Sequence, residues 1–290
     1  MIHRRQIWAL LAVTALVGGT VLAQMRGGRG FGGRSGRSLV EVTTERGNVP
    51  NWPVDPRFAK DSFTFARLKY RSSRPERSSY GWFTDYRDAD LNLSFRLQQL
   101  TAIKVNPDPV VLEITDPKLG DYPWIFMSGA GNITLDEKEA ATLRRYFLNG
   151  GFMMVDDFWG QAEWDGVATA LKQVFPEFEP QDIPRSHPIF HAVYNIDDNL
   201  SLQTPNIMTA RGSQTTGITW EDNHEGGNTR DVHFRGIFDS KGRLMVMLCH
   251  NTDNGDGWEE ETTADWFFHT FSENKNFPLG INIIFYAMTH

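Results

Sequence analysis

The sequence predicts an α/β fold, a three-layer sandwich with a mostly parallel central sheet and a less regular second half. Between residues 61 and 176, short apolar segments alternate with longer segments of helical period. The apolar segments are continuous, which is typical of parallel strands that helices cover on both faces. A hydrophobic fraction of 40%, with 20 Phe and 9 Trp, supplies enough bulky apolar surface for a core.

The first half of the chain supplies four strands and three helices. The strands are expected at residues 63–70, 110–114, 124–127 and 152–155. The first helix begins at Asp88 or Asp90, either of which can cap it. The second follows a capping box formed by Thr134 and Glu137 and stops at Gly150, and the third spans residues 162–175.

The second half is less regular. Glycine, asparagine and aspartate punctuate residues 211–231. Residues 233–239 and 244–249 read as a pair of strands, with Lys241 and Gly242 in the turn between them. Pro278 begins a last, apolar helix over residues 279–288.

Residues 1–23 predict a secretory signal peptide. Arg4 and Arg5 form a basic start, a short apolar centre follows, and Val21-Leu22-Ala23 places small residues at the exit. The apolar run is short for a spanning helix, which favours cleavage, while an uncleaved N-terminal anchor stays open. We therefore expect an exported protein, periplasmic or extracellular, with no membrane span after signal cleavage. General secretion fits the surroundings of the arginine pair better than twin-arginine export.

Residues 24–60 predict a Gly/Arg-rich flexible linker, and residues 61–290 a single α/β domain. The run Gly28–Gly33 matches a dinucleotide fingerprint, but no strand precedes it. No cofactor is identified from the sequence.

The acidic balance of the chain argues against nucleic acid as a partner. The net charge is −7, and residues 1–23 hold two arginines and no acid, so the remainder is more acidic still. An envelope glycan or a protein partner remains open. The only cysteine, Cys249, lies in an apolar run that predicts a buried, inert thiol.

In open parallel sheets, ligands bind beyond the carboxyl ends of the strands. Three predicted strands end in polar residues, and neighbouring strands would bring these ends together. The ligand-binding candidates at these ends are Ser128, Gly129, Asp157, Trp159, Asp253, Asp256 and Trp258. The tryptophans offer rings that stack on sugars, although core packing is the competing interpretation.

Asp156, Asp157 and His187 are the catalytic candidates. The aspartates can act as acid and base or hold a divalent cation through oxygen ligands, while the simpler interpretation has one capping a turn and the other solvated. His187 and His191 have a spacing that suits zinc, but no third ligand is evident and Pro188 favours a helix-edge role for His187. Residues 251–261 resemble a calcium loop but miss its required glycine and glutamate, which predicts a loose acidic surface loop.

Several motifs together resemble the bacterial family called domain of unknown function 4159 over roughly residues 61–290. The matching segments are 84–92, 123–129, 148–152, 156–159, 187–190 and 280–282. The resemblance implies a flavodoxin-like or amidotransferase-like fold, similar to the class I glutamine amidotransferase-like superfamily with its ThuA-like members. Amidotransferases carry a cysteine in the turn that here holds Asp156 and Asp157, so their chemistry is not implied.

These observations leave three functions open, one of which is a structural envelope protein whose Gly/Arg-rich tail engages anionic partners. The absence of a complete catalytic constellation favours a noncatalytic exported module that binds a ligand or partner in the cell envelope. The alternative is a hydrolase or sugar-modifying enzyme that uses the carboxylates and histidine at the strand ends, with or without a divalent metal.

Overall fold

The structure, a computed structural model, describes residues 46–58, 61–74 and 81–290. The predicted signal peptide, the Gly28–Gly33 run and residues 24–45 of the predicted linker lie outside the described residues. Two residues near the end of that linker contact the domain. Arg46 Nη1 donates to the Pro107 carbonyl at 2.7 Å, and Trp52 Nε1 donates to the Val105 carbonyl at 2.8 Å.

A seven-stranded sheet forms the central layer, in the order β3-β1-β4-β6-β9-β8-β7. The first five strands of this order pair in parallel, and the last two pairings are antiparallel. The strands are β1 (Ala66–Lys69), β3 (Val110–Glu113), β4 (Trp124–Ser128), β6 (Phe152–Phe158), β7 (Gln181–Asp182), β8 (His233–Phe238) and β9 (Leu244–His250). A separate two-stranded sheet joins β2 (Arg71–Ser72) to β5 (Ile133–Thr134).

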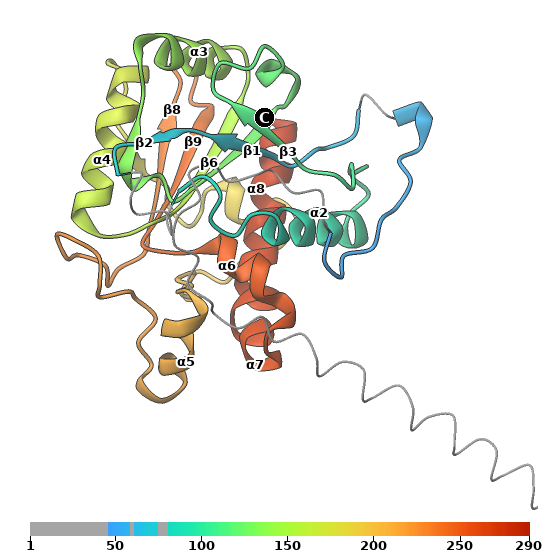
Figure 1. Ribbon diagram of the computed structural model, residues 1–290, viewed down its shortest axis with the longest axis vertical. Coiled ribbons are helices and arrows are strands. Elements are labelled where there is room, and N and C mark those ends of the chain that lie inside the picture. The colour runs from blue at the N-terminus through green and yellow to red at the C-terminus, as the bar shows by residue number, and fades with distance from the viewer. Residues whose placement is uncertain (1–45, 59–60, 75–80) are drawn as a thin grey trace, which may run out of the picture. The chain divides into compact units, whose positions relative to one another are not determined.

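Helices cover both faces of the large sheet, which confirms the three-layer α/β prediction (Figure 1). One face carries α3 (Glu137–Leu148) and α4 (Gly160–Val174), and the other carries α2 (Asp88–Leu100) and α8 (Phe277–Thr289). The remaining helices are α5 (Ile207–Thr216), α6 (Asn254–Glu259) and α7 (Asp265–Phe267), followed by the π-helical segment η6 (Phe268–Asn276). Short 3-10 turns are η1 (Pro56–Phe58), η2 (Leu119–Asp121), η3 (Ala130–Asn132), η4 (Pro188–Phe190) and η5 (Glu260–Thr262).

The first four residues of β6, Phe152–Val155, show why this part of the strand is apolar throughout. Phe152 and Met154 pack on the face covered by α2 and α8, while Met153 and Val155 pack on the face covered by α3 and α4. Successive side chains of a strand point to opposite faces, so a strand buried on both sides needs apolar residues at every position.

The predicted hairpin in the second half is confirmed. Strands β8 and β9 pair antiparallel, with Gly242 at a positive φ of 84° in the connecting turn. Within the described residues, no helix combines the length and apolar character needed to cross a membrane.

The capping box of α3 lies two residues later than the sequence predicted. Asp136 Oδ1 accepts from the Glu139 N–H and Glu139 Oε2 accepts from the Asp136 N–H, each at 2.9 Å. Thr134 belongs to β5, whose pairing with Arg71 delays the start of the helix. The chain has two overlapping cap patterns, and this tertiary pairing selects the second.

Candidate functional site

The polar ends of β4, β6 and β9 lie side by side, because these three strands are neighbours in the sheet. Ser128 pairs with Asp156 in the β4–β6 register, and Phe158 pairs with His250 in the β6–β9 register. The segments that follow these strands therefore meet at one edge, which we call the carboxyl edge. Figure 1 shows α6, which follows β9, beyond this edge of the sheet.

Asp156 connects the end of β6 to α6. Its Oδ2 accepts from the N–H groups of Asn254 and Gly255 at 2.8 and 3.0 Å, and its Oδ1 accepts from Asn254 Nδ2 at 2.7 Å. The interpretation of Asp156 as the cap of the turn that follows it is therefore wrong, because Asp156 bonds to the first turn of a helix that lies far along the chain. Burial raises the pKa of Asp156 to about 7, against the opposing effect of these hydrogen bonds.

Asp157 lies in an irregularity of β6. The register with β9 shifts between Val155 and Phe158, and Asp157 has a φ of +52°, which is uncommon for a residue other than glycine. Such a bulge redirects side chains at the end of a strand. Asp157 is only 6% exposed, so the interpretation of a solvated aspartate is wrong. Burial, and then the nearby Glu221 carboxylate, raise the pKa of Asp157 well above its usual value.

The segment after β9 is buried and helical, and the prediction of a loose acidic surface loop is wrong. Residues 251–258 are all buried, because α6 packs between α2 and η6. Asp253 Oδ1 accepts from the Asp256 N–H at 2.7 Å, and Asp256 Oδ2 accepts from the Ile207 N–H at 2.8 Å. These bonds orient both carboxylates at the start of α6.

A third aspartate, Asp85, joins this pair. It precedes α2 with a φ of +60° and is 9% exposed. One carboxylate oxygen from each of Asp85, Asp253 and Asp256 lies within 4.8 Å of the other two. Burial, followed by the Asp256 and Glu259 carboxylates, raises the pKa of Asp85 well above its usual value. No motif around Asp85 predicts a function for it, because nothing local marks its approach to α6.

His224 bridges two acids next to Asp157. Its Nδ1 lies 3.0 Å from Glu163 Oε1, and its Nε2 lies 3.2 Å from Glu221 Oε2. Burial opposes the charged ring, but the hydrogen bonds to both carboxylates outweigh burial and raise the pKa of His224 to about 9. The imidazole is therefore protonated at neutral pH, with both nitrogens donating. No sequence pattern marks this group, since His224 lies in an irregular loop and Glu163 on α4.

A cavity of about 240 Å³ lies over this histidine at the carboxyl edge. Its polar lining consists of Arg74, Asn132, Glu163, Asn223, His224 and Glu225. Arg74 and Glu225 form a two-bond ion pair, with both N–O distances 3.1 Å. Together with the His224–Glu163 pair, this gives the described lining equal numbers of cationic and anionic side chains.

The two tryptophans predicted to bind a ligand, Trp159 and Trp258, are buried inside the protein. Trp159 and Trp258 have 0% exposure, so neither ring presents a face on which a sugar could stack. Trp258 Nε1 donates to the Asn276 carbonyl at 2.9 Å, and the Trp159 ring stacks against His224 with centroids 5.8 Å apart and an angle of 27° between the planes.

Ser128 and Gly129 belong to the same edge. The Ser128 side chain is buried, and its Oγ has no hydrogen-bond partner among the described residues. Gly129 has a φ of +62°, and a Cβ there would lie 2.8 Å from the Gly81 nitrogen. This glycine permits the close contact between the loops that precede α2 and follow β4.

His187 lies away from the aspartates, near the amino end of β9. Its ring contacts Phe238 and Tyr286, and Phe238 pairs with Leu244, the first residue of β9. His187 Nδ1 accepts from the Ile189 N–H at 3.2 Å, which is the helix-edge role that Pro188 predicted. His191 bonds instead to Asn195 and the Arg185 carbonyl. His187 and the aspartate pair are therefore at opposite edges of the sheet.

Cys249 is fully buried on β9, as its apolar surroundings predicted. Burial raises the pKa of its thiol well above the usual value, with a smaller contribution from Asp156. A thiol held in its protonated form is a poor nucleophile.

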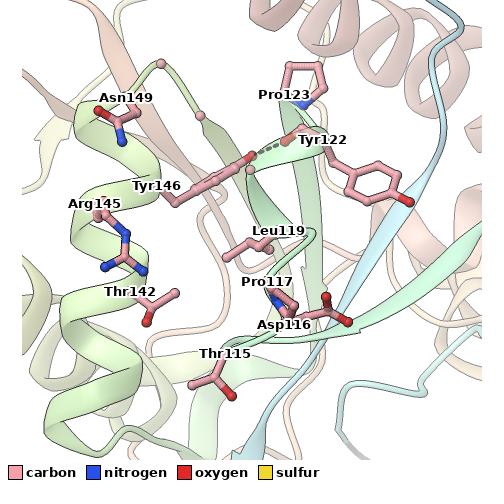
Figure 2. A pocket seen from close by; sticks show the side chains of 13 residues that line it. Thr115, Asp116, Pro117, Leu119, Tyr122, Pro123, Thr142, Arg145, Tyr146 and Asn149 are labelled. Atoms are coloured by element: carbon pink, nitrogen blue, oxygen red, sulfur yellow. Dashed lines mark hydrogen bonds between the residues drawn. The ribbon is translucent and has the colours of Figure 1, made fainter. Parts of the chain in front are cut away.

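A second cavity, of about 350 Å³, lies at the opposite, amino edge of the sheet (Figure 2). The segments before β4 and β6 form it together with the end of α3. Tyr146 Oη donates to the Tyr122 carbonyl at 2.9 Å across its floor, and Arg145 lines its side. None of the residues predicted for the site lines this cavity or the cavity over His224.

The comparisons with known proteins agree with the motif resemblance. The family model described as "Domain of unknown function (DUF4159)" matches residues 64–288. No curated protein matches the chain.

Proposed function

We propose that this chain, which belongs to the DUF4159 family, is a noncatalytic binding module for a neutral, hydroxyl-rich ligand. An envelope glycan is the candidate, with one sugar unit held in the cavity at the carboxyl edge. The observation that carries this proposal is the charge-balanced polar lining of that cavity.

The chemistry of the lining supports a neutral ligand. Arg74 and protonated His224 carry positive charge, while Glu225 and Glu163 carry negative charge at short distance from them. An ionic ligand would have to break one of these pairs. Hydroxyl groups both donate and accept, so they can bond to either member of such a pair without separating the charges. The amides of Asn132 and Asn223 add further donors and acceptors.

The position of the cavity also supports binding. It lies between segments that follow β4 and β6, where ligands of open α/β sheets are found. Its volume suits a single ring better than a large ligand.

A glycan-binding screen of the purified chain tests this proposal. Asn223 is exposed and lines the cavity, so Asn223→Ala should remove a ligand contact while leaving the fold intact. We expect about tenfold weaker binding, the value of one or two hydrogen bonds. Asn149→Ala, which alters the cavity at the amino edge, is the matched control and should bind normally. The proposal fails if no glycan binds, or if only Asn149→Ala weakens binding.

A hydrolase or sugar-modifying enzyme is the second candidate. The specific observation in its favour is Asp157, a buried carboxyl in a left-handed backbone conformation next to the His224 pair. In such an enzyme, His224 would be the histidine that acts with Asp157, a role that the sequence suggested for His187. Incubation with the glycan from the screen distinguishes the two functions. Product formation that Asp157→Asn abolishes would favour the enzyme, and an unchanged ligand favours the binding module.

Location in the cell envelope is part of the proposal and rests on residues 1–23. The same resemblance that indicates the family suggests a bacterial source and a likeness to the amidotransferase-like superfamily. Expression of the complete gene product, followed by fractionation and mass determination of its N-terminus, tests the export. A mature protein that begins at Gln24 in the exported fraction is the expected result.

A further inference from the structure

We propose that Asp85, Asp253 and Asp256 form a binding site for a hard divalent cation, Ca²⁺ or Mg²⁺. This site lies beside the cavity of the proposed function and does not depend on it, because none of the three aspartates lines that cavity.

The spacing of the three carboxylates suits such an ion. One oxygen of each lies within 4.8 Å of the other two. Oxygen ligands of Ca²⁺ lie at about 2.3–2.6 Å from the metal, so two ligands on opposite sides are about 4.6–5.2 Å apart and adjacent ligands are closer. All three carboxylates can therefore reach one central ion without a rearrangement of the backbone.

A buried oxygen with no partner points independently to a ligand. Asp85 is 9% exposed, and its Oδ2 is completely buried and accepts no hydrogen bond from any described residue. Buried polar atoms are almost always satisfied, and an ionised oxygen is the most costly to leave without a partner. A cation between Asp85 and the start of α6 would supply the missing contact.

The backbone around this oxygen is shaped to admit it. A Cβ at Gly255 would lie only 2.0 Å from Asp85 Oδ2. The absence of a side chain at Gly255 thus lets the Asp85 carboxylate approach the first turn of α6. The same turn carries Asp256, and Asp253 is the N-cap residue directly before α6.

The charges of the surroundings require compensation. The Asp157 and Glu259 carboxylates also lie close enough to act on Asp85. Arg67 is the nearby cation, but Asp90 holds its guanidinium at 2.5–3.1 Å in a buried ion pair. Its remaining N–H groups donate to the carbonyls of Trp82 and Thr84. When all three aspartates are ionised, they therefore carry more negative charge than the neighbouring described residues neutralise, and a bound cation would favour this ionised state.

Hydrogen bonds hold two of the ligands in place. Asp253 Oδ1 and Asp256 Oδ2 each accept one backbone N–H, which orients each carboxylate. Metal ligands are commonly fixed by such outer hydrogen bonds.

Titration of the full chain with the metals alone tests this inference. The protein is first stripped with a chelator and then titrated separately with CaCl₂ and MgCl₂, by calorimetry and by thermal unfolding. We expect saturable binding of about one ion per chain, and a rise of several degrees in Tm at saturation with at least one of the two metals. The comparison of the two salts identifies the preferred ion.

Asp85→Asn is the decisive variant, because it removes one carboxylate charge while the amide keeps nearly the same size and shape. We expect its affinity for the metal to fall at least about tenfold. In the presence of chelator, the Tm of Asp85→Asn should equal or exceed that of the wild type, since one of several like charges is gone. Asp256→Asn is the second variant, and its affinity for the metal should fall in the same way. Asp165→Asn, at an exposed aspartate of α4, is the matched control and should bind normally. Absence of a metal response in the wild type, or wild-type affinity in Asp85→Asn or Asp256→Asn, would overturn the inference.

Discussion

Asp156 accepts hydrogen bonds from both the side chain and the backbone of Asn254, at 2.7 and 2.8 Å, and so attaches the end of β6 to the start of α6. The two residues are 98 positions apart in the chain. This contact places Asp253 and Asp256 opposite Asp85 and next to Asp157. An aspartate at the end of a central strand thus organises the carboxyl edge through its hydrogen bonds.

Asp156→Ala is expected to lower the free energy of unfolding by about 3 kcal/mol, because buried donors of Asn254 and Gly255 lose their acceptor. Asp156→Asn should cost less, since its amide oxygen still accepts from the two backbone N–H groups. Urea unfolding followed by circular dichroism measures both. Asp165→Ala, at an exposed position, should change stability by less than about 0.5 kcal/mol. Equal effects at positions 156 and 165 would contradict the anchoring role.

The buried ion pair between Arg67 and Asp90 predicts that substitutions of two basic residues on the same strand, Arg67 and Lys69, differ greatly in their effect on stability. Arg67→Met should destabilise the protein by about 3–5 kcal/mol, because it leaves the Asp90 carboxylate buried without its partner. Lys69→Met removes a pair with Glu113 that is exposed to solvent, so its cost should stay below about 1 kcal/mol. Chemical denaturation of the two variants side by side gives the comparison. A cost at position 67 as small as that at position 69 would show that the Asp90 charge is relieved in another way.

The bridging histidine predicts a pH dependence of stability. The pKa of His224 rises from about 6.5 in the unfolded chain to about 9 in the fold. A raised histidine pKa stabilises the fold fully below the unfolded value, and this stabilisation is lost as the pH rises through about 9. After allowance for solvent screening, we expect a loss of about 2 kcal/mol between pH 6.5 and 9.5.

His224→Gln isolates this contribution from other groups that titrate in the same range. The variant should be less stable than the wild type at pH 6.5 and approach it by pH 9.5. Thermal or urea unfolding at several pH values measures the difference. Parallel pH profiles for the two proteins would exclude a protonated His224 as a source of stability.

Gly255 predicts a steric effect that the helix propensity of alanine cannot compensate. Gly255→Ala should cost about 2 kcal/mol, because the new methyl group would overlap Asp85 Oδ2 and force the two loops apart. Gly212 is the matched control, since it also lies in a helix but a Cβ there meets no atom within 4 Å. Gly212→Ala should be neutral or stabilise the protein by about 0.5–1 kcal/mol. The shift in Tm of each variant is the measurement, and a neutral Gly255→Ala would mean that the Asp85 carboxylate is free to move.

Periodicity predicted the fold well, because it reports burial directly. The apolar run Phe152–Val155 and the helical spacing in 162–175 each reflect which faces are covered, and both elements form where expected within a few residues. The cap of α3 shows the limit of local patterns, since Thr134–Glu137 and Asp136–Glu139 both satisfy the rule. Pairing of β5 with β2, a contact outside the pattern, decides between them.

The candidate site was predicted only in part. The rule of strand ends located Asp156, Asp157, Asp253 and Asp256 at a common edge. It did not indicate Asp85, Glu163 or His224, because these residues lie in a turn, on a helix and in an irregular loop without a recognisable motif. It also grouped His187 with the aspartates, although the strand next to His187 begins at the other edge of the sheet.

The sequence by itself determined the alternation of buried strands and amphipathic helices, and with it the three layers and the edge where polar residues gather. Those features arise from spacing along the chain, which the sequence contains. The tertiary structure decided which polar groups meet, as Asp85 with Asp256 and His224 with Glu163 and Glu221. Such contacts depend on the order and register of strands and on the packing of distant loops, which no local pattern of residues specifies.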